Sequence, residues 1–266
     1  MIVDIGAGLL QCVKDAKFPY WRDTIHLFVG GSALHGAKVE GYDDLDIYGV
    51  FVEPPEKIIG VDAYEHFVWS TGTNDSKNTK DDIDITLYGL KKWAQLACKG
   101  NPSILHFLFA SNTVKIPNLA LDTWFQAVTQ YREHFVCKKH AKQFLGFGSA
   151  QLMRMTGERC RNVNRPDLVE QYGYDTKFAM HVIRLLVECE ELMKTGQITL
   201  PSIEKDLLIE IRTGKHTQEW VIEEANRRFV LCKEAEQNSK LRPEIDRNFV
   251  SKVISEAYLR HWRYSG

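Results

Sequence analysis

The 266-residue sequence has no closely spaced cysteines, no long apolar run and almost no net charge. The nearest two of its six cysteines, Cys137 and Cys160, are 23 residues apart, which excludes the paired spacing of a zinc site or a redox motif. No apolar run approaches the ~20 residues that cross a bilayer, so no membrane partner is expected. Residues 1–14 lack the pattern of a cleaved secretory signal. These absences predict a reduced, cytoplasmic protein.

The balance of charge excludes a further class of protein. Lys and Arg number 34 and Asp and Glu number 35, which leaves a formal net charge of −1. A protein that holds nucleic acid through an overall positive charge is therefore excluded, and an acidic partner must be bound by a local patch. The hydrophobic fraction of 44% is that of a globular protein and is enough to bury a sizeable core.

The first 110 residues show short apolar runs separated by turn residues. Alternation and β-rich composition predict strands over residues 25–29, 46–52, 66–69 and 83–88. Helices are predicted before the first strand and over residues 90–98 and 103–109. Residues 70–82 are polar and predict a loop.

From about residue 122 the pattern becomes helical almost throughout. Helical spacing of apolar residues predicts helices over residues 131–155, 175–193, 219–236 and 248–262. The sequence therefore predicts an α+β fold followed by a mostly helical part. Residues 112–117 are the best candidate for a boundary, which divides the chain into residues 1–115 and 116–266.

A glycine-rich turn follows the first predicted strand. Gly30, Gly31 and Ser32 let the backbone turn sharply and present its N–H groups, and the serine adds a hydroxyl donor for an anion. The next strand carries Asp44 and Asp46, which are two residues apart and therefore share a face. Two parallel carboxylates repel each other unless a cation lies between them. Mg²⁺ or Mn²⁺ is the expected cation because Mg²⁺ prefers such hard oxygen ligands.

A third acid, Asp84, lies on a later strand between Ile83 and Ile85. Three acids on adjacent strands could hold two metal ions about 3.5–4 Å apart. One ion would bind a triphosphate and the other would lower the pKa of an attacking hydroxyl, whose proton Asp84 could accept. The pattern therefore predicts Asp44, Asp46 and Asp84 as catalytic residues and metal ligands.

At these residues the sequence resembles the DNA polymerase beta nucleotidyltransferase superfamily, whose signature is this Gly-Ser, Asp-x-Asp and a later strand Asp. The stretches DITLY at 84–88, KGNP at 99–102 and YGYDTK at 172–177 resemble more narrowly the predicted nucleotidyltransferases of the RNA-repair-pathway DNA polymerase beta family. These stretches lie within residues 28–190, about three-fifths of the chain.

The resemblance implies a small mixed β-sheet nucleotidyltransferase core with flanking helices in residues 1–115. The mostly helical C-terminal domain, residues 116–266, would complete the nucleotide and acceptor site. By the same resemblance, Gly31 and Ser32 bind the triphosphate and the three acids bind metal. Asp43 stands where many members of the superfamily carry a small hydroxyl residue, which adds negative charge to the site.

The predicted helix over 175–193 carries one polar stripe. Lys177, His181 and Arg184 lie at i, i+4 and i+7, so they share a face. They are expected to bind nucleotide, with the two cations neutralising phosphate, although His181 could instead be a core residue. His35, within the glycine-rich turn, is a further nucleotide-binding candidate. A lone histidine near apolar residues is more often structural, and His106 is interpreted in that way.

Residues 132–165 form a local basic segment with eight Lys or Arg against two acids. Such a surplus could track the backbone of an RNA or DNA acceptor, or could only balance acids elsewhere in the fold. Residues 159–165 are predicted to form a loop in which arginine can grip phosphate. The predicted acceptor-binding residues are Arg154, Arg159, Arg161 and Arg165.

These observations predict an enzyme that moves a nucleoside monophosphate from an NTP, ATP or CTP first of all, to an acceptor hydroxyl. The resemblance implies RNA repair or tRNA end processing, hence an RNA acceptor, and nothing in the chain is large enough to read a template duplex. Two alternatives stay open. The acceptor could be a hydroxyl of a protein or a small molecule, or the chain could be a non-catalytic module that senses a nucleotide.

Overall fold

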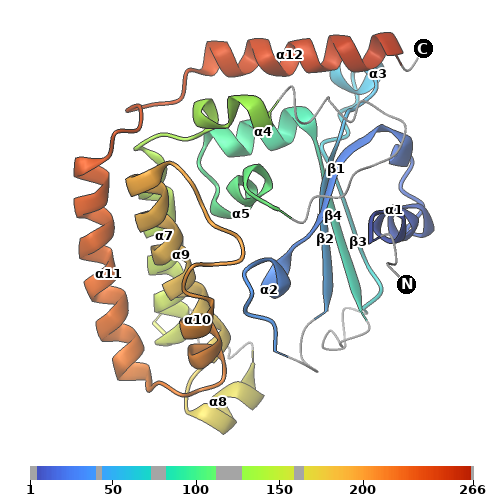
Figure 1. The fold of residues 1–266 in the computed structure, drawn as a ribbon. Coiled ribbons are helices and arrows are strands. Elements are labelled where there is room, and N and C mark those ends of the chain that lie inside the picture. The colour runs from blue at the N-terminus through green and yellow to red at the C-terminus, as the bar shows by residue number, and fades with distance from the viewer. Residues whose placement is uncertain (1–4, 40–43, 73–81, 112–127, 159–164, 265–266) are drawn as a thin grey trace.

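Four strands form one mixed sheet in the computed structural model, which describes residues 5–39, 44–72, 82–111, 128–158 and 165–264 (Figure 1). In their order across the sheet, the strands are β1 (Thr24–Val29), β2 (Leu45–Phe51), β4 (Ile83–Gly89) and β3 (His66–Ser70). β2 and β4 run parallel, whereas the two outer pairs are antiparallel. Each predicted strand is present, and its ends differ from the prediction by at most one residue.

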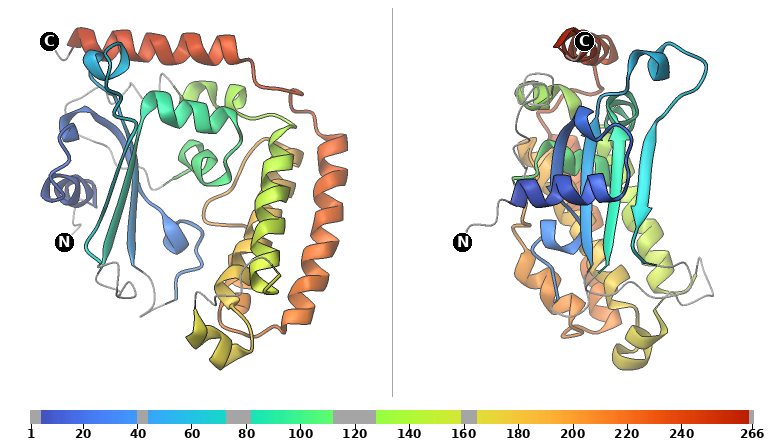
Figure 2. Two further views of the ribbon diagram at one scale, coloured as in Figure 1. Left: turned by 180° about the vertical axis from the view of Figure 1, so that it is seen from behind. Right: turned by 90° about the vertical axis from the view of Figure 1, so that its right-hand side faces the viewer.

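Alternation along these strands separates two faces of the sheet. On one face, Ile47 and Ile85 are fully buried and pack in one cluster with Leu9 of α1 (Ile5–Asp15). Figure 2 shows α1 lying along this face. Because neighbouring residues on a strand point to opposite sides, the side chains next to these apolar residues face the rest of the molecule.

Helices from both halves of the chain make up the rest of the described structure. In chain order they are η1 (Trp21–Asp23), α2 (Gly31–Leu34), α3 (Pro55–Ile58), α4 (Leu90–Cys98), α5 (Pro102–Leu105), η2 (His106–Leu108), η3 (Thr129–Phe135), α7 (His140–Met155), α8 (Pro166–Tyr172), α9 (Thr176–Thr195), α10 (Lys205–Arg212), α11 (Gln218–Asn238) and α12 (Arg247–Tyr264). A continuous hydrophobic core joins the two halves, extending from Phe28 on the sheet through Trp93 of α4 to Val182 of α9.

Helix α9 is the centre of the helical half. It packs against α7, α10 and α11 (Figure 1). The Asp175 carboxylate caps its first turn by accepting the N–H groups of Lys177 and Phe178 at 3.0 and 3.1 Å. Gly196 ends the helix in a left-handed conformation. The amphipathic helix predicted over residues 175–193 is thus confirmed, and its apolar side is buried on several neighbours.

The last helix, α12, returns to the N-terminal half and packs on α4 (Figure 1). The Trp262 indole N–H donates to the Glu53 carbonyl at 3.0 Å, and His261 Nε2 lies 3.0 Å from the Asp23 carboxylate. The C-terminal helix therefore packs over part of the N-terminal half and shields it from solvent. The predicted boundary between residues 115 and 116 lies outside the described residues, and the division into two domains stays a prediction.

The prediction of one helix over residues 131–155 is wrong. Val136 adopts an extended backbone (φ −124°, ψ 144°) between η3 and α7, and its buried side chain joins the core. The Lys138 N–H then donates to the Arg242 carbonyl at 3.0 Å instead of to a helical neighbour. A tertiary contact has therefore replaced the local helical pattern.

Other element predictions need smaller corrections. The helix expected over residues 103–109 is a single α-helical turn followed by the 3₁₀ turn η2. The short helices α3, α8 and α10 were not predicted because so few turns produce little periodicity. The helices expected over 90–98, 219–236 and 248–262 are confirmed. The predicted class is confirmed as well: an α+β part with a mixed sheet precedes a mostly helical part. No helix within the described ranges is long and apolar enough to cross a membrane.

Candidate active site

The turn after β1 is shaped by side chains of β2 that lie over it. Gly31 has φ +58°, and a Cβ placed on it would lie 1.8 Å from Asp46 Oδ2. A Cβ on Gly30 would lie 2.0 Å from the Tyr48 ring. The Gly30 N–H donates to the Asp46 carbonyl at 2.9 Å. Glycine is required at both positions because any larger residue would displace a side chain of β2.

The three predicted acids are placed by this turn and by strand register. Asp44 immediately precedes β2, and Asp46 is the second residue of that strand. Asp46 pairs directly with Asp84 of the parallel neighbour β4, so their side chains start from adjacent positions on one face. Burial, then the charge of Asp46 and more weakly that of Asp84, raises the pKa of the Tyr48 hydroxyl. The two carboxylates therefore create a negative field at one place on the sheet.

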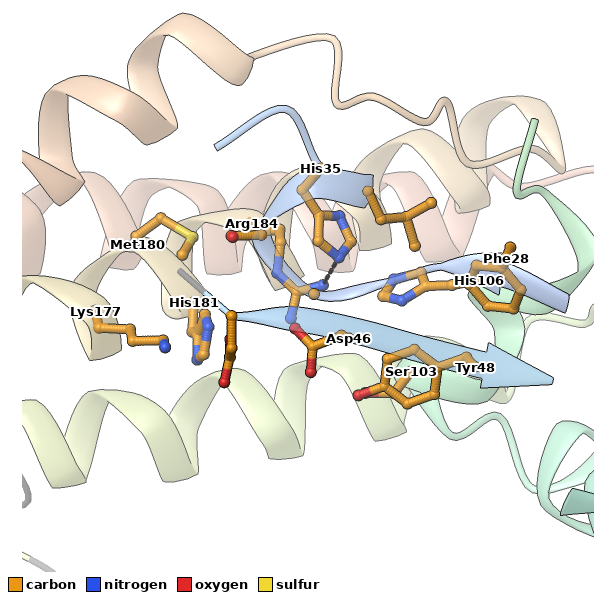
Figure 3. Close-up of a pocket in the computed structure, with 14 residues that line it drawn as sticks. Phe28, His35, Asp46, Tyr48, Ser103, His106, Lys177, Met180, His181 and Arg184 are labelled. Atoms are coloured by element: carbon orange, nitrogen blue, oxygen red, sulfur yellow. Dashed lines mark hydrogen bonds between the residues drawn. The ribbon is translucent and has the colours of Figure 1, made fainter. Parts of the chain in front are cut away.

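A cavity of about 270 Å³ lies between this part of the sheet and α9. Asp44 and Asp46 line its sheet side, together with Gly31 and Ser32 of the turn. Figure 3 shows side chains of α9 opposite Asp46. The other residues that line the cavity are Phe28, Leu34, His35, Tyr48, Ser103, His106, Lys177, Met180, His181 and Arg184. The structure thus brings the turn, two of the acids and the predicted helix residues together around one space.

Helix α9 supplies the cationic side of the cavity. Lys177, His181 and Arg184, the residues of the predicted stripe, all line it (Figure 3), and their contact with a nucleotide stays a prediction. Burial, and then the nearby charges of Arg184 and Lys177, hold the pKa of His181 well below its usual range. His181 is therefore neutral near pH 7 and can donate one hydrogen bond and accept another.

Arg184 is 9% exposed and is held by two polar partners. Its Nη1 donates to His35 Nε2 at 2.8 Å and to Glu188 Oε1 at 3.2 Å. Its buried Nε has no hydrogen-bond partner among the described residues. Because Arg184 also lines the cavity, its positive charge lies beside the space that a ligand would fill.

His35 lies behind the glycine-rich turn and not at its exposed edge. It is 6% exposed, although part of it lines the cavity. Burial, and then the charge of Arg184, lowers its pKa to about 3. Its nucleotide contact stays a prediction, and in this structure its ring nitrogens face Arg184 and Glu188.

Of the predicted acceptor residues, the two that the structure describes, Arg154 and Arg165, are not part of the cavity lining. Arg154 is exposed on the last turn of α7. Arg165 donates to the Asp175 carboxylate at 3.0 Å and stacks over the Phe178 ring. Arg165 therefore supports Asp175, the residue that caps the N-terminus of α9 and lies two residues before Lys177. Two more predicted residues, Arg159 and Arg161, lie outside the described residues, as does Asp43.

A comparison with known proteins identifies the family of this chain. The profile of the RNA repair pathway DNA polymerase beta family (RlaP) matches residues 1–258. This chain belongs to that family. It is thus a member of a polymerase beta-type nucleotidyltransferase family linked to RNA repair.

Two further similarities were found. An uncharacterized 38.9 kDa protein of Enterobacteria phage T4, from the nrdC–mobD intergenic region, is 32% identical over 117 residues. The match covers 44% of this chain and 34% of the phage protein, so the chain matches about a third of that relative's length. The crystal structure of a nucleotidyltransferase-like protein from Exiguobacterium sibiricum is similar over 86% of this chain and 75% of that one, with 13% identity and a TM-score of 0.30.

Sequence reasoning missed several residues that lie in this family member's cavity or directly behind it. Glu188 was not singled out, although it lies four residues after Arg184 and thus on the same side of α9. That spacing is a signal that could have found it. Tyr48 shares a strand face with Asp46 and could have been found in the same way. Ser103 and Met180 are brought to the cavity by tertiary packing alone.

Proposed function

We propose that this family member transfers a nucleoside monophosphate from an NTP to an acceptor hydroxyl. The observation that carries this proposal is the pairing of charge across one cavity. Asp44 and Asp46 line its sheet side, with Asp84 paired to Asp46 on the neighbouring strand, whereas Lys177 and Arg184 line its α9 side. A site for a metal-bound triphosphate needs both: acids for the metal and cations for the phosphates.

The three acids fit a pair of divalent ions, Mg²⁺ or Mn²⁺. Their oxygens are the hard ligands that Mg²⁺ prefers. Asp46 is opposite Asp84, and Asp44 is two residues before Asp46, so all three acids start from the same end of the two central strands. When bound, such ions would neutralise the triphosphate and lower the pKa of the attacking hydroxyl.

The residues of the chain position the reactants. Gly31 and Ser32 present backbone N–H groups and a hydroxyl to the phosphates, and Lys177 and Arg184 neutralise their charge. An acceptor oxygen forms a bond to the α-phosphorus in line, the bond from that phosphorus to the bridging oxygen breaks, and pyrophosphate leaves. Asp84 accepts the proton of the acceptor hydroxyl. Catalysis is mainly alignment and stabilisation of charge.

An RNA end is the acceptor that we propose. The family is linked to RNA repair. Within the basic segment over residues 132–165, Arg154 is exposed on α7 of the helical half. Transfer is expected to be template-independent, with ATP or CTP as donor. His35 and His181 would contact the nucleotide from the inner side of the cavity.

Transfer of label tests this proposal. Each of the four NTPs, labelled at the α-phosphate, is incubated with the protein, Mg²⁺ or Mn²⁺, and pooled tRNA. The expected result is label on RNA from one or two of the NTPs, release of pyrophosphate, and loss of both with Asp44→Asn and Asp46→Asn.

Other results would change the assignment. Label on the protein itself or on a small hydroxyl compound would make that molecule the acceptor. Metal-dependent binding of nucleotide without turnover would favour a sensor. If neither binding nor transfer is seen, the site assignment is refuted.

A further inference from the structure

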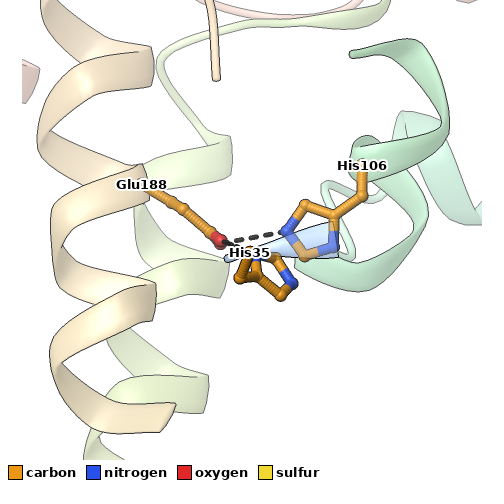
Figure 4. Close-up of side chains that lie close together, drawn as sticks. All are labelled: His35, His106 and Glu188. Carbon is orange, nitrogen blue, oxygen red and sulfur yellow. Dashed lines mark hydrogen bonds and ion pairs between the residues drawn. The ribbon is translucent and has the colours of Figure 1, made fainter. Parts of the chain in front are cut away.

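A buried carboxylate lies directly behind the proposed nucleotide site. Glu188 of α9 is 2% exposed and contacts Arg184, His35 and His106, of which Figure 4 shows the two histidines. Its Oε1 lies 3.2 Å from both Arg184 Nη1 and His35 Nδ1, and its Oε2 lies 3.0 Å from His106 Nε2. A buried charge is tolerated only when its partners satisfy it, so this cluster is a specific arrangement of the fold.

The cluster joins three separate parts of the chain. His35 directly follows the one-turn helix α2 of the glycine-rich turn, His106 begins η2, and Arg184 and Glu188 lie on α9. The two imidazole rings pack edge to face with their centroids 4.7 Å apart. Glu188 thus links the phosphate-binding turn of the sheet half to the cationic helix of the other half.

The hydrogen bonds define where the protons lie. A guanidinium can only donate, so His35 Nε2 accepts from Arg184 and carries no proton. The neutral ring then carries its proton on Nδ1, which faces Glu188 Oε1 at ion-pair distance but off the line of a good hydrogen bond. Burial alone would raise the pKa of Glu188, but Arg184 and His106 outweigh it and hold that pKa well below its usual range. One buried anion therefore balances one buried cation.

His35, His106 and Glu188 could also be considered as ligands for a transition metal, since their donor atoms lie within 4.8 Å of one another. The charge of Arg184 argues against this. Its Nη1 is within hydrogen-bond distance of both His35 and Glu188. A divalent ion would leave three positive charges against one carboxylate in a buried place, which is unfavourable. The guanidinium is thus the cation that this cluster is built to hold.

We propose that Glu188 is a positioning residue for nucleotide binding, which acts by holding the Arg184 guanidinium and the His35 ring at the inner side of the cavity. The proposal rests on the proposed nucleotide site. Arg184 has a long side chain with many rotamers, and fixing it before the ligand arrives removes an entropic penalty from binding. The carboxylate itself does not line the cavity, so its effect on the nucleotide passes through Arg184 and His35.

The test is a double-mutant cycle on nucleotide affinity. The Kd for Mg²⁺–NTP is measured for wild type, Glu188→Gln, Arg184→Gln and the double variant, each at a temperature where circular dichroism shows it folded. Glu188→Gln should raise the Kd about tenfold in the wild-type background. It should change the Kd less than twofold in the Arg184→Gln background, because the guanidinium that it holds and that guanidinium's hydrogen bond to His35 are both gone.

Glu53→Gln is the matched control. Glu53 is also a buried acid, 3% exposed, but its carboxylate binds the Leu90 N–H and the Tyr258 hydroxyl, away from the cavity. This variant should lower the Tm without changing the Kd. If Glu188→Gln does the same, Glu188 is only structural and the proposal is overturned. Equal factors in both backgrounds of the cycle would also overturn it.

Two further measurements complete the experiment. If Glu188→Gln does not fold, Glu188→Asp keeps the charge at a shorter reach and should raise the Kd at least threefold; a wild-type Kd would refute the proposal. If purified wild type contains stoichiometric zinc and Glu188→Gln does not, the proposal is overturned in favour of a metal site.

Failure of the proposed function can be told apart from failure of this inference. If wild type binds no nucleotide, the proposed function fails together with this inference. Binding by wild type, lost in Asp46→Asn and unchanged in Glu188→Gln, refutes this inference alone.

Discussion

The two sides of the cavity place their charged residues by different means. On the sheet side, Asp46 and Asp84 are set by backbone register, because they are paired positions on neighbouring parallel strands. On the helix side, Arg184 is set by tertiary contacts, since it is nearly buried and held by Glu188 and His35. Strand register thus fixes where the sheet acids start, whereas buried polar partners hold the guanidinium on the helix side. Loss of a sheet residue should therefore affect turnover, and loss of a helix residue should mainly affect affinity.

The largest effect is expected for the sheet side. Asp46→Asn removes one charge from the proposed metal site while it keeps the volume of the side chain. The kcat/KM for transfer of label should fall on the order of 1,000-fold, as for other losses of transition-state charge stabilisation. Asp62→Asn, in an exposed loop, is the control and should be neutral. A loss below tenfold for Asp46→Asn would remove this residue from the catalytic set.

The helix side should respond differently. Lys177→Met keeps most of the aliphatic stem but removes the charge that faces the phosphates, and a charge-assisted hydrogen bond contributes about 1.5–3 kcal/mol. The KM for the NTP should rise about 30-fold, with a smaller change in kcat. Lys194→Met removes a lysine from the far end of the same helix, where it pairs with Glu190, and should leave the KM unchanged. A fall in kcat at constant KM would contradict the comparison.

His35 lies where the two sides meet, and it should make the fold sensitive to acid. Its folded-state pKa of about 3 lies below the usual 6.5, so only the unfolded chain takes up its proton in between. The stability that the neutral His35 contributes is therefore fully present above about pH 6.5, and it is lost as the pH is lowered toward 3. At pH 5 this residue should account for a loss of about 2 kcal/mol in the free energy of unfolding. Urea unfolding of wild type and His35→Gln at pH 7 and pH 5 measures it, and equal losses in the two proteins would contradict the assignment.

The glycine-rich turn allows a sharper test of the sheet side. Gly31→Ala would bring a Cβ against Asp46 in a left-handed conformation, and should lower the free energy of unfolding by about 1–2 kcal/mol. Nucleotide affinity should weaken as Asp46 moves. Gly146→Ala in α7 is the control, because its Cβ meets no atom within 4 Å and should stabilise the helix by ~1 kcal/mol or less. Matching effects of the two substitutions would show that the turn is not constrained by Asp46.

The smallest effect is expected outside both sides of the cavity. Arg154→Ala should reduce transfer to RNA a few-fold and lower the salt dependence of RNA binding by about one counterion, with the KM for the NTP unchanged. Lys233→Ala, on the exposed side of α11, is the control. If the two variants behave alike in titrations at several salt concentrations, the predicted acceptor surface does not include Arg154.

Much of the sheet side could be predicted from the sequence because its signals are local. Alternation located every strand to within one residue at each end, and Asp46 beside Ile47 had to face away from the core. The stripe of Lys177, His181 and Arg184 followed from helical spacing alone, and all three residues line the cavity. The break at Val136 was not predictable in this way, because an apolar residue at helical spacing has the same local pattern whether or not the helix continues.

The strands, the glycine-rich turn, the acids and the polar stripe of the long helix follow from local sequence, since each depends on neighbours a few residues away. Which cavity that stripe faces, and which groups hold it there, depends on how distant parts of the chain pack together. Glu188 contacts His35 and His106, which are 153 and 82 residues away in the chain. Such contacts depend on how the hydrophobic core docks α9 beside the sheet, and no local period records that docking. For this reason the acids were visible in the sequence, whereas the buried carboxylate behind the cations was visible only in the fold.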